Sequence, residues 1–195
     1  MKTWKAFFVA LCLPVLGFSL DKLDEKYLIV FGDPKAPVQI TQYFSMTCPH
    51  CLSLFKKDFK VIKQKYLDTK KASWSFHPVP LDSLTVQVID CLSKLNPRQK
   101  VILLEALLDT LQIQDGPEVV LFLIQEAMKT FSQPIVELDD KEYITKTQAF
   151  WDAFNFIKQE DHLEAVPAVE VDGVLYRKEI PDQAFIEKQM QVRLS

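Results

Sequence analysis

The stretch Thr47-Cys48-Pro49-His50-Cys51 places two cysteines three positions apart. It separates an alternating apolar segment, residues 38–44, from a segment with helical periodicity that begins at Cys51. A Cys-x-x-Cys pair at a strand-to-helix junction is typical of a redox motif.

The position of the pair predicts its reactivity. If a helix begins within the motif, its unpaired backbone N–H groups and the positive end of its dipole point at Cys48. That environment favours the thiolate, which is the attacking species. Pro49 suits the first helical turn, and His50 adds a potentially cationic ring. Cys51 lies within disulfide reach, so we predict that the protein exchanges disulfides through Cys48 and Cys51.

A zinc site is the main alternative for a cysteine pair. Zinc normally takes four Cys or His ligands, commonly from paired motifs. The other candidates are Cys91, His77 and His162, which are single and scattered. The spacing therefore favours redox chemistry without a metal or other cofactor, and Cys91 is expected to be a small buried hydrophobe. A non-catalytic module that binds zinc or a partner protein stays open as a function of a different class.

Composition limits the remaining functions. The chain has 195 residues, of which 48% are hydrophobic and 25% charged, and this is typical of a globular protein. The length suits one domain, or one domain with a sizeable insertion. Only four glycines are present, which argues against Gly-rich phosphate loops. No basic patch interleaved with aromatic residues is found, so we expect no nucleic-acid partner.

Residues 1–19 are predicted to be a secretory signal peptide. Lys2 and Lys5 form a basic start, residues 6–18 are almost wholly apolar, and Gly17-Phe18-Ser19 places small residues where signal peptidase needs them. An uncleaved membrane anchor is the less favoured alternative, because the apolar run is short for a membrane span. Export would place the protein where disulfides persist, and we expect a periplasmic location.

Periodicity predicts three successive blocks of secondary structure. The first block is a strand followed by a βαβ unit, with elements at residues 27–31, 38–44, 51–66 and 72–77. The second block is helical, at residues 84–95, 97–112, 119–131 and 140–160, although residues 119–124 also suit a strand by propensity. The third block is a hairpin turning at Asp172-Gly173, with strands at residues 165–171 and 174–177, and a helix opened by Pro181. In the fourth helix we expect four buried side chains: Phe150, Trp151, Phe154 and Ile157.

With these features together, the chain resembles the DsbA-like branch of the thioredoxin superfamily, exported thiol–disulfide oxidoreductases with a helical insertion. The resemblance rests on residues 32–38, on Phe44-Ser45 ahead of the Cys-Pro-His-Cys motif, on the interval 80–164, and on residues 165–168 before Val171-Asp172-Gly173. It implies an α/β, thioredoxin-like fold with an inserted all-helical domain. The expected divisions are residues 20–80 and 164–195 for the thioredoxin-like domain and residues 81–163 for the insertion.

The resemblance also implies roles for residues outside the motif. Pro167 would follow a cis peptide bond and face the disulfide, although sequence alone favours trans. The Val166 backbone would then be free to bond an extended substrate. His50 would set the low pKa of Cys48 and make the disulfide form strongly oxidising.

Gln42 departs from the family pattern. Six residues before the first cysteine, relatives commonly place a buried carboxylate that shuttles protons to and from the second cysteine. Glutamine hydrogen-bonds but does not take a proton at neutral pH. We therefore expect slower proton transfer at Cys51, or a water molecule in that role. The alternative, given equal weight, is that Gln42 is only a polar residue beneath the strand whose hydrogen bonds are satisfied.

The resulting hypothesis is a periplasmic oxidase that donates the Cys48–Cys51 disulfide to thiol-containing exported proteins. The resemblance implies reoxidation by a membrane quinone-linked partner of the DsbB type. A reductase or isomerase acting on disulfide-containing proteins through the same scaffold is the alternative within enzymes.

Overall fold

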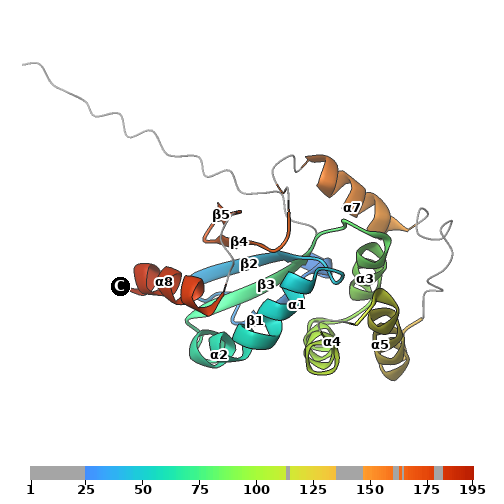
Figure 1. Ribbon diagram of the computed structural model, residues 1–195, viewed down its shortest axis with the longest axis horizontal. Coiled ribbons are helices and arrows are strands. Elements are labelled where there is room, and N and C mark those ends of the chain that lie inside the picture. The colour runs from blue at the N-terminus through green and yellow to red at the C-terminus, as the bar shows by residue number, and fades with distance from the viewer. Residues whose placement is uncertain (1–24, 113–114, 135–146, 160–162, 164, 178–181) are drawn as a thin grey trace, which may run out of the picture.

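The structure is a computed structural model, described for residues 25–112, 115–134, 147–159, 163, 165–177 and 182–195 (Figure 1). A five-stranded sheet forms its centre, with strands in the order β1-β3-β2-β4-β5. Their bounds are β1 Ile29–Gly32, β2 Val38–Phe44, β3 Ala72–Pro78, β4 Ala168–Val171 and β5 Val174–Tyr176. Strands β2 and β3 are parallel, which confirms the predicted βαβ unit, and the other pairs are antiparallel.

A helix with two irregular stretches joins β2 to β3. It runs as α1 Pro49–Leu54, a π-helical segment Phe55–Phe59, α2 Lys60–Ile62 and a second π-helical segment Lys63–Leu67. Figure 1 shows the helical block grouped to the right of the sheet and the last helix to its left. The block contains α3 Ser83–Ser93, α4 Pro97–Thr110, α5 Pro117–Thr130 and α7 Gln148–Gln159, and the last helix is α8 Gln183–Leu194.

Local sequence signals account for most of the boundaries. Asp82 caps α3 by accepting the Thr85 N–H, and Asn96 forms a capping box with Gln99 at the start of α4. Residues 119–124 are helical within α5, as predicted. At the β4–β5 turn, Asp172 and Gly173 both have positive φ, of 49° and 81°, as a two-residue hairpin turn requires.

Three expectations about these elements are wrong in detail. The first strand begins at Ile29, because Tyr27 ends a short 3₁₀ turn. The strand predicted from residue 165 begins at Ala168, after the Val166-Pro167 peptide. Trp151 is 49% exposed, because neighbouring positions on a helix point about 100° apart and α7 packs through Ala149 instead. Phe150 is half-buried, and the side chains of residues 154 and 157 lie outside the described set.

Residues 1–24 and 135–146 are also outside the described set, so the signal-peptide prediction and the first part of the predicted fourth helix are not tested. None of the described helices is long and apolar enough to cross a membrane.

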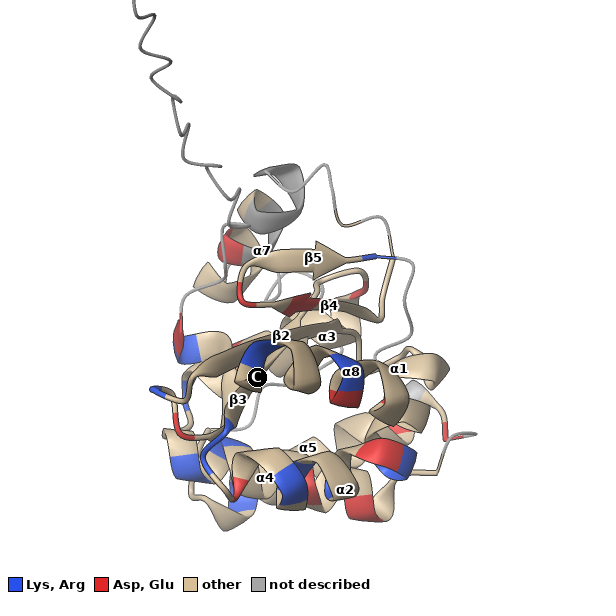
Figure 2. Cartoon of the chain, turned by 90° about the vertical axis from the view of Figure 1, so that its left-hand side faces the viewer, with Lys and Arg blue, Asp and Glu red and all other residues tan. Residues whose placement is uncertain are grey.

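Charges of both signs share the surface of the helices. Figure 2 shows basic and acidic segments close together on α4. Lysines from the helix between β2 and β3 form ion pairs with nearby acids, such as Lys63 with Asp68 at 3.1 Å and Lys65 with Glu187 at 2.8 Å. Such exposed pairs contribute little stability, so the fold depends on the apolar core.

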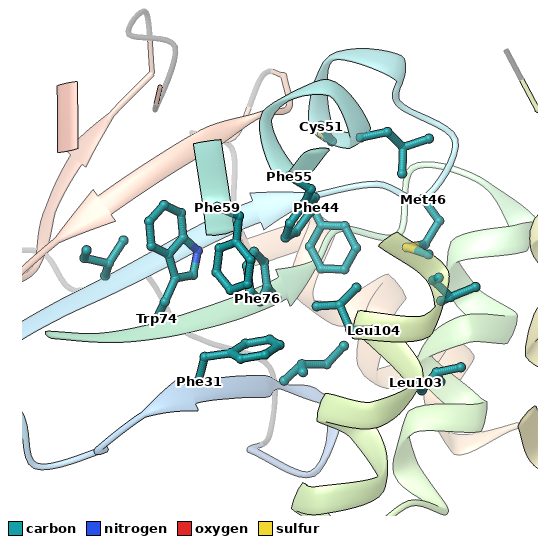
Figure 3. Packing of buried hydrophobic residues seen from close by; sticks show 14 of the residues in the cluster. Phe31, Phe44, Met46, Cys51, Phe55, Phe59, Trp74, Phe76, Leu103 and Leu104 are labelled. Carbon is teal, nitrogen blue, oxygen red and sulfur yellow. The ribbon is translucent and has the colours of Figure 1, made fainter. Parts of the chain in front are cut away.

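A cluster of aromatic side chains packs the helix between β2 and β3 against the sheet (Figure 3). Phe76 of β3 is fully buried at its centre. Five aromatic rings lie within 4.4–6.0 Å of the Phe76 ring centroid: Phe31, Phe44, Phe55, Phe59 and Trp74. Most of these pairs meet edge to face, the arrangement that aromatic rings favour. Because Phe55 and Phe59 belong to the helix, this cluster sets where the helix begins relative to the sheet.

We predict that Phe76→Ala lowers the free energy of unfolding by about 3–5 kcal/mol, the usual cost of removing a buried phenyl ring. The measurement is denaturant unfolding. The matched control is Phe122→Ala, because Phe122 is 59% exposed on α5 and its removal should change stability by less than about 0.5 kcal/mol. Equal losses of unfolding free energy in the two variants would show that the aromatic cluster does not stabilise the fold.

Candidate active site

Cys48 is the N-cap residue of α1. Its backbone is extended, with φ −87° and ψ 110°, and Pro49 occupies the first helical position. The Cys48 sulfur accepts a hydrogen bond from the Cys51 backbone N–H at 3.4 Å, and the Cys48 carbonyl accepts the Leu52 N–H at 3.2 Å. The helix therefore begins inside the motif, as predicted, and starts two residues earlier than the periodicity alone indicated.

The two thiols differ in accessibility. Cys51 is fully buried, whereas Cys48 is half-buried. Both cysteines are free, so the structure describes the dithiol form. Of the two sulfurs, only that of Cys48 can be reached by another molecule without moving the helix.

The pKa values of the pair move in opposite directions. The pKa of Cys48 falls from an ordinary 9.0 to about 6, first because the Cys51 thiol donates to its sulfur, and further through the backbone N–H groups of Cys51 and His50, against the opposing effect of burial. The pKa of Cys51 is raised by its hydrogen bond with Cys48 and by burial, and the Ser45 backbone N–H only partly offsets this. The first proton therefore leaves Cys48, and the resulting thiolate is stabilised by contacts within the motif.

His50 contributes less than the sequence indicated. Its ring charge is the smallest of the named causes that lower the Cys48 pKa. The residue is exposed, so water screens the charge, whereas the thiol and backbone donors act in direct contact with the sulfur. The expectation that His50 sets the pKa is therefore wrong: Cys51 and the helix start have the larger effect.

The Val166-Pro167 loop faces the pair. The peptide bond between these residues is cis, as the resemblance implied. The Val166 carbonyl oxygen lies 3.7 Å from the Cys48 sulfur and accepts its thiol proton. In the dithiol form this carbonyl is thus engaged rather than free, which differs from the expectation. A thiolate has no proton to donate, so ionisation of Cys48 releases the carbonyl for another partner.

Gln42 lies in β2 beneath the helix and is 2% exposed. Its Nε2 and the Trp74 Nε1 have no hydrogen-bond partner within the described part of the chain. Both side chains line a cavity of about 10 Å³, together with Asp58 and with Leu54, which stands one helical turn beyond Cys51. That volume is about the smallest that holds a single water.

The candidate zinc ligands do not converge on the pair. The His77 ring is buried against Tyr43, with ring centroids 4.9 Å apart. Cys91 is buried in the core of α3, and burial raises its pKa to about 11. Within the described residues, which exclude His162, no group of three His, Cys, Asp or Glu side chains could hold a metal ion. The geometry around the pair therefore suits redox chemistry better than zinc.

Sequence reasoning missed a polar network beside the motif. The Asp82 carboxylate accepts hydrogen bonds from Thr47 Oγ1 at 2.8 Å and from Ser45 Oγ at 3.0 Å. The sequence identified Asp82 only as a helix cap, because nothing local connects it with hydroxyls 35 and 37 positions earlier.

Comparison with known proteins agrees with this architecture. The family model described as Thioredoxin matches residues 24–188. A Rickettsia typhi protein provisionally named a protein-disulfide oxidoreductase is 39% identical over 57 residues, which are 29% of this chain and 20% of that protein. A Rickettsia bellii protein with the same name is 38% identical over 53 residues, covering 27% of this chain and 20% of that protein. The chain thus matches about a fifth of the length of these relatives.

Solved structures extend the likeness over most of the chain. BdbD from Bacillus subtilis superimposes with a TM-score of 0.66 and 18% identity, covering 89% of this chain and 96% of that one. Wolbachia pipientis alpha-DsbA1 gives 0.62 and 20% identity, covering 85% and 90%, and Chlamydia trachomatis DsbA gives 0.58 and 21% identity, covering 85% and 89%. The chain therefore belongs to the thioredoxin family, and its fold is that of the DsbA-type proteins.

Proposed function

We propose that this protein is an exported protein dithiol–disulfide oxidoreductase that acts as an oxidase through Cys48 and Cys51. The observation that carries the proposal is the position of Cys48 as the N-cap of α1, where its sulfur accepts the Cys51 backbone N–H at 3.4 Å. The Cys51 thiol and the backbone N–H groups at this helix start lower the pKa of Cys48 to about 6. The names of the Rickettsia relatives and the DsbA-type fold support the same class of chemistry.

The oxidase reaction begins from the Cys48–Cys51 disulfide. A substrate thiolate attacks the Cys48 sulfur, the disulfide breaks, and the electron pair leaves with Cys51, which takes up a proton. A second substrate thiolate then attacks the substrate sulfur of the mixed disulfide and expels Cys48 as a thiolate. The substrate loses two electrons and becomes a disulfide, and the protein gains them as the dithiol.

The stable Cys48 thiolate favours this direction. A thiol with a low pKa is a good leaving group, and stabilising the reduced form makes the disulfide form a stronger oxidant. Burial of Cys51 directs the attack to the more accessible Cys48 sulfur. Val166 and Pro167, next to Cys48, are proposed to hold the substrate backbone, since the Val166 carbonyl accepts only the Cys48 thiol proton and is available when that proton is absent, as it is in the disulfide.

Location and partners follow from the sequence and the resemblance. We infer that residues 1–19 direct export to the periplasm, that residues 81–163 form the helical insertion between the two thioredoxin-like parts, 20–80 and 164–195, and that a membrane quinone-linked protein of the DsbB type restores the disulfide. The proposed substrates are exported proteins with free cysteines. A reductase or isomerase would use the same scaffold with Cys48 attacking substrate disulfides.

Serine variants test the proposal in an oxidative refolding assay of a reduced, disulfide-containing protein. Cys48→Ser and Cys51→Ser should each abolish disulfide transfer, because neither variant can form the Cys48–Cys51 disulfide that the substrate thiolate attacks. Cys91→Ser is the control and should retain activity, since Cys91 is buried in α3 and is 3% exposed.

Transfer that persists in Cys48→Ser would overturn the proposal. The reduction potential of the pair decides the direction: we expect a value near about −120 mV, as in a strong oxidant, and a value near about −270 mV would favour the reductase alternative.

The lowered pKa also predicts how stability depends on pH. Between about 6 and 9.0, the folded dithiol protein carries a Cys48 thiolate, whereas the unfolded chain carries the protonated thiol. The unfolded state binds more protons in this window, so the free energy of unfolding of the reduced protein should rise with pH. Cys48→Ser should lack this rise. Denaturant midpoints of both proteins measured from pH 6 to 9 check it, and parallel curves would contradict the lowered pKa.

Substitution at Gln42 tests the proton-transfer hypothesis. In Gln42→Glu a carboxylate replaces the amide beneath the helix, and we expect the step that protonates or deprotonates Cys51 to accelerate by up to about 100-fold. For deprotonation of Cys51 the gain should appear as the pH rises through the carboxyl pKa, which burial raises, and for protonation of Cys51 it should appear as the pH falls through that pKa. Gln42→Met, of similar volume, is the control and should leave the pH dependence unchanged. Identical rates for the wild type and Gln42→Glu at every pH would show that position 42 has no part in proton transfer.

A further inference from the structure

The Asp82 carboxylate serves two elements at once. Its Oδ1 caps α3, accepting the Thr85 N–H at 2.8 Å, and the Thr85 hydroxyl lies between the two oxygens, 3.1 Å from Oδ1 and 3.0 Å from Oδ2. Its Oδ2 accepts the Thr47 hydroxyl at 2.8 Å and the Ser45 hydroxyl at 3.0 Å. An N-cap needs only the first oxygen. The second oxygen joins the first helix of the helical block to the segment that leads into the cysteine motif.

The two hydroxyl residues belong to the segment that places both sulfurs. The Ser45 carbonyl accepts the Cys48 N–H at 3.2 Å, and the Ser45 hydroxyl accepts the Thr47 N–H at 3.2 Å. The Ser45 backbone N–H acts on the Cys51 sulfur, where it favours the ionised form. Ser45 is 2% exposed, so its hydrogen bonds are shielded from water. A shift of Ser45 or Thr47 would therefore move the helix start against both thiols.

The bond that such a shift would disturb is a weak one. The Cys51 N–H donates to the Cys48 sulfur over 3.4 Å, and sulfur is a weaker hydrogen-bond acceptor than oxygen. The bonds that Asp82 accepts, at 2.8 and 3.0 Å, are of ordinary length, and a charged acceptor makes them stronger than bonds between neutral groups. Strong contacts at one end of the segment can thus hold a weak contact at the other end.

We propose that Asp82 is a positioning residue for the thiol pair: by holding Ser45 and Thr47, it fixes the start of α1 and keeps its backbone N–H groups directed at Cys48. The inference rests on the proposed function, since it concerns the same two cysteines. It assigns the helical block a part in tuning the pair, through the residue that begins its first helix.

Asp82 could act on the Cys48 thiolate by holding Ser45 and Thr47 in position or by its charge, and the two mechanisms predict different changes in the stability of the thiolate. A carboxylate that acted only through its charge would disfavour a thiolate nearby, and removing its hydrogen bonds would leave that effect in place. If Asp82 acts by position, cutting the bonds while keeping the carboxylate should destabilise the thiolate. The sign of the change separates the two mechanisms.

The decisive variant is Ser45→Ala combined with Thr47→Val, which keeps the Asp82 charge and its cap on Thr85. The readouts are the Cys48 pKa, from the ultraviolet absorbance of the thiolate, and the rate of Cys48 alkylation at pH 6. We expect a higher pKa, alkylation slower by about threefold or more, and a more reducing pair, because less thiolate is present. Thr47→Val alone, at an exposed position, should change each readout in the same direction by a smaller amount and covers the case in which the double variant does not fold.

Two Asp→Asn substitutions at helix caps form a matched pair, in which Asp82→Asn is the test and Asp182→Asn is the control. Asp182 caps α8 through the Phe185 N–H at 2.8 Å, in the same way that Asp82 caps α3. Asp182→Asn should leave the thiol readouts unchanged, whereas Asp82→Asn, which keeps a good cap but loses the charged acceptor, should raise the Cys48 pKa. The denaturant midpoints of the two variants show whether both substitutions lower the stability of the protein by similar amounts.

An unchanged or lower Cys48 pKa in the double variant overturns the inference, as does a lower pKa in Asp82→Asn. The proposed function fails separately: it is contradicted if the wild-type pKa is that of an ordinary cysteine. A low wild-type pKa that the Ser45 and Thr47 substitutions leave unaltered would overturn only the role of Asp82.

Discussion

The hydrogen bond from the Cys51 backbone N–H to the Cys48 sulfur is the contact on which the proposed chemistry depends. It exists because Cys48 is the N-cap of α1, so the helix directs donors at the sulfur that have no acceptor inside the helix. A cysteine in mid-helix would meet no such donors. The low pKa of Cys48 therefore depends first on the hydrogen bond from the Cys51 thiol and then on where the helix begins, and the ring charge of the exposed histidine adds least to it.

Where the helix begins is in turn set by packing on the sheet. Phe55 and Phe59 fit against Phe76 and hold the helix across β3 (Figure 3). The segment before the helix is held from the other direction by Asp82. The two constraints act on either side of Cys48, one apolar and one polar. Together they explain how a weak sulfur hydrogen bond is kept in place between larger structural units.

Structural features that depend on residues close together in the chain could be predicted from the sequence. The Cys-x-x-Cys pair, the caps at Asp82 and Asn96 and the Asp172-Gly173 turn each depend on residues within a few positions, and the structure confirms each as a local feature. The contact between Asp82 and Thr47 spans 35 positions and has no local signature. The small weight of His50 and the exposure of Trp151 were missed for a related reason, since both depend on how solvent reaches a side chain in the assembled fold.

The asymmetry between the two cysteines follows from the same geometry. An N-cap residue sits at the helix end, where its side chain reaches the surface, whereas the residue one turn on faces the sheet and is buried. Burial disfavours ionisation of Cys51, while the helix start favours ionisation of Cys48. Each thiol shift reinforces the other, because a protonated Cys51 can donate to an ionised Cys48. The Cys48 sulfur is thus suited to act as nucleophile and leaving group, and the Cys51 sulfur, one helical turn away, is suited to hold a proton. Stepwise disulfide exchange requires this division of roles.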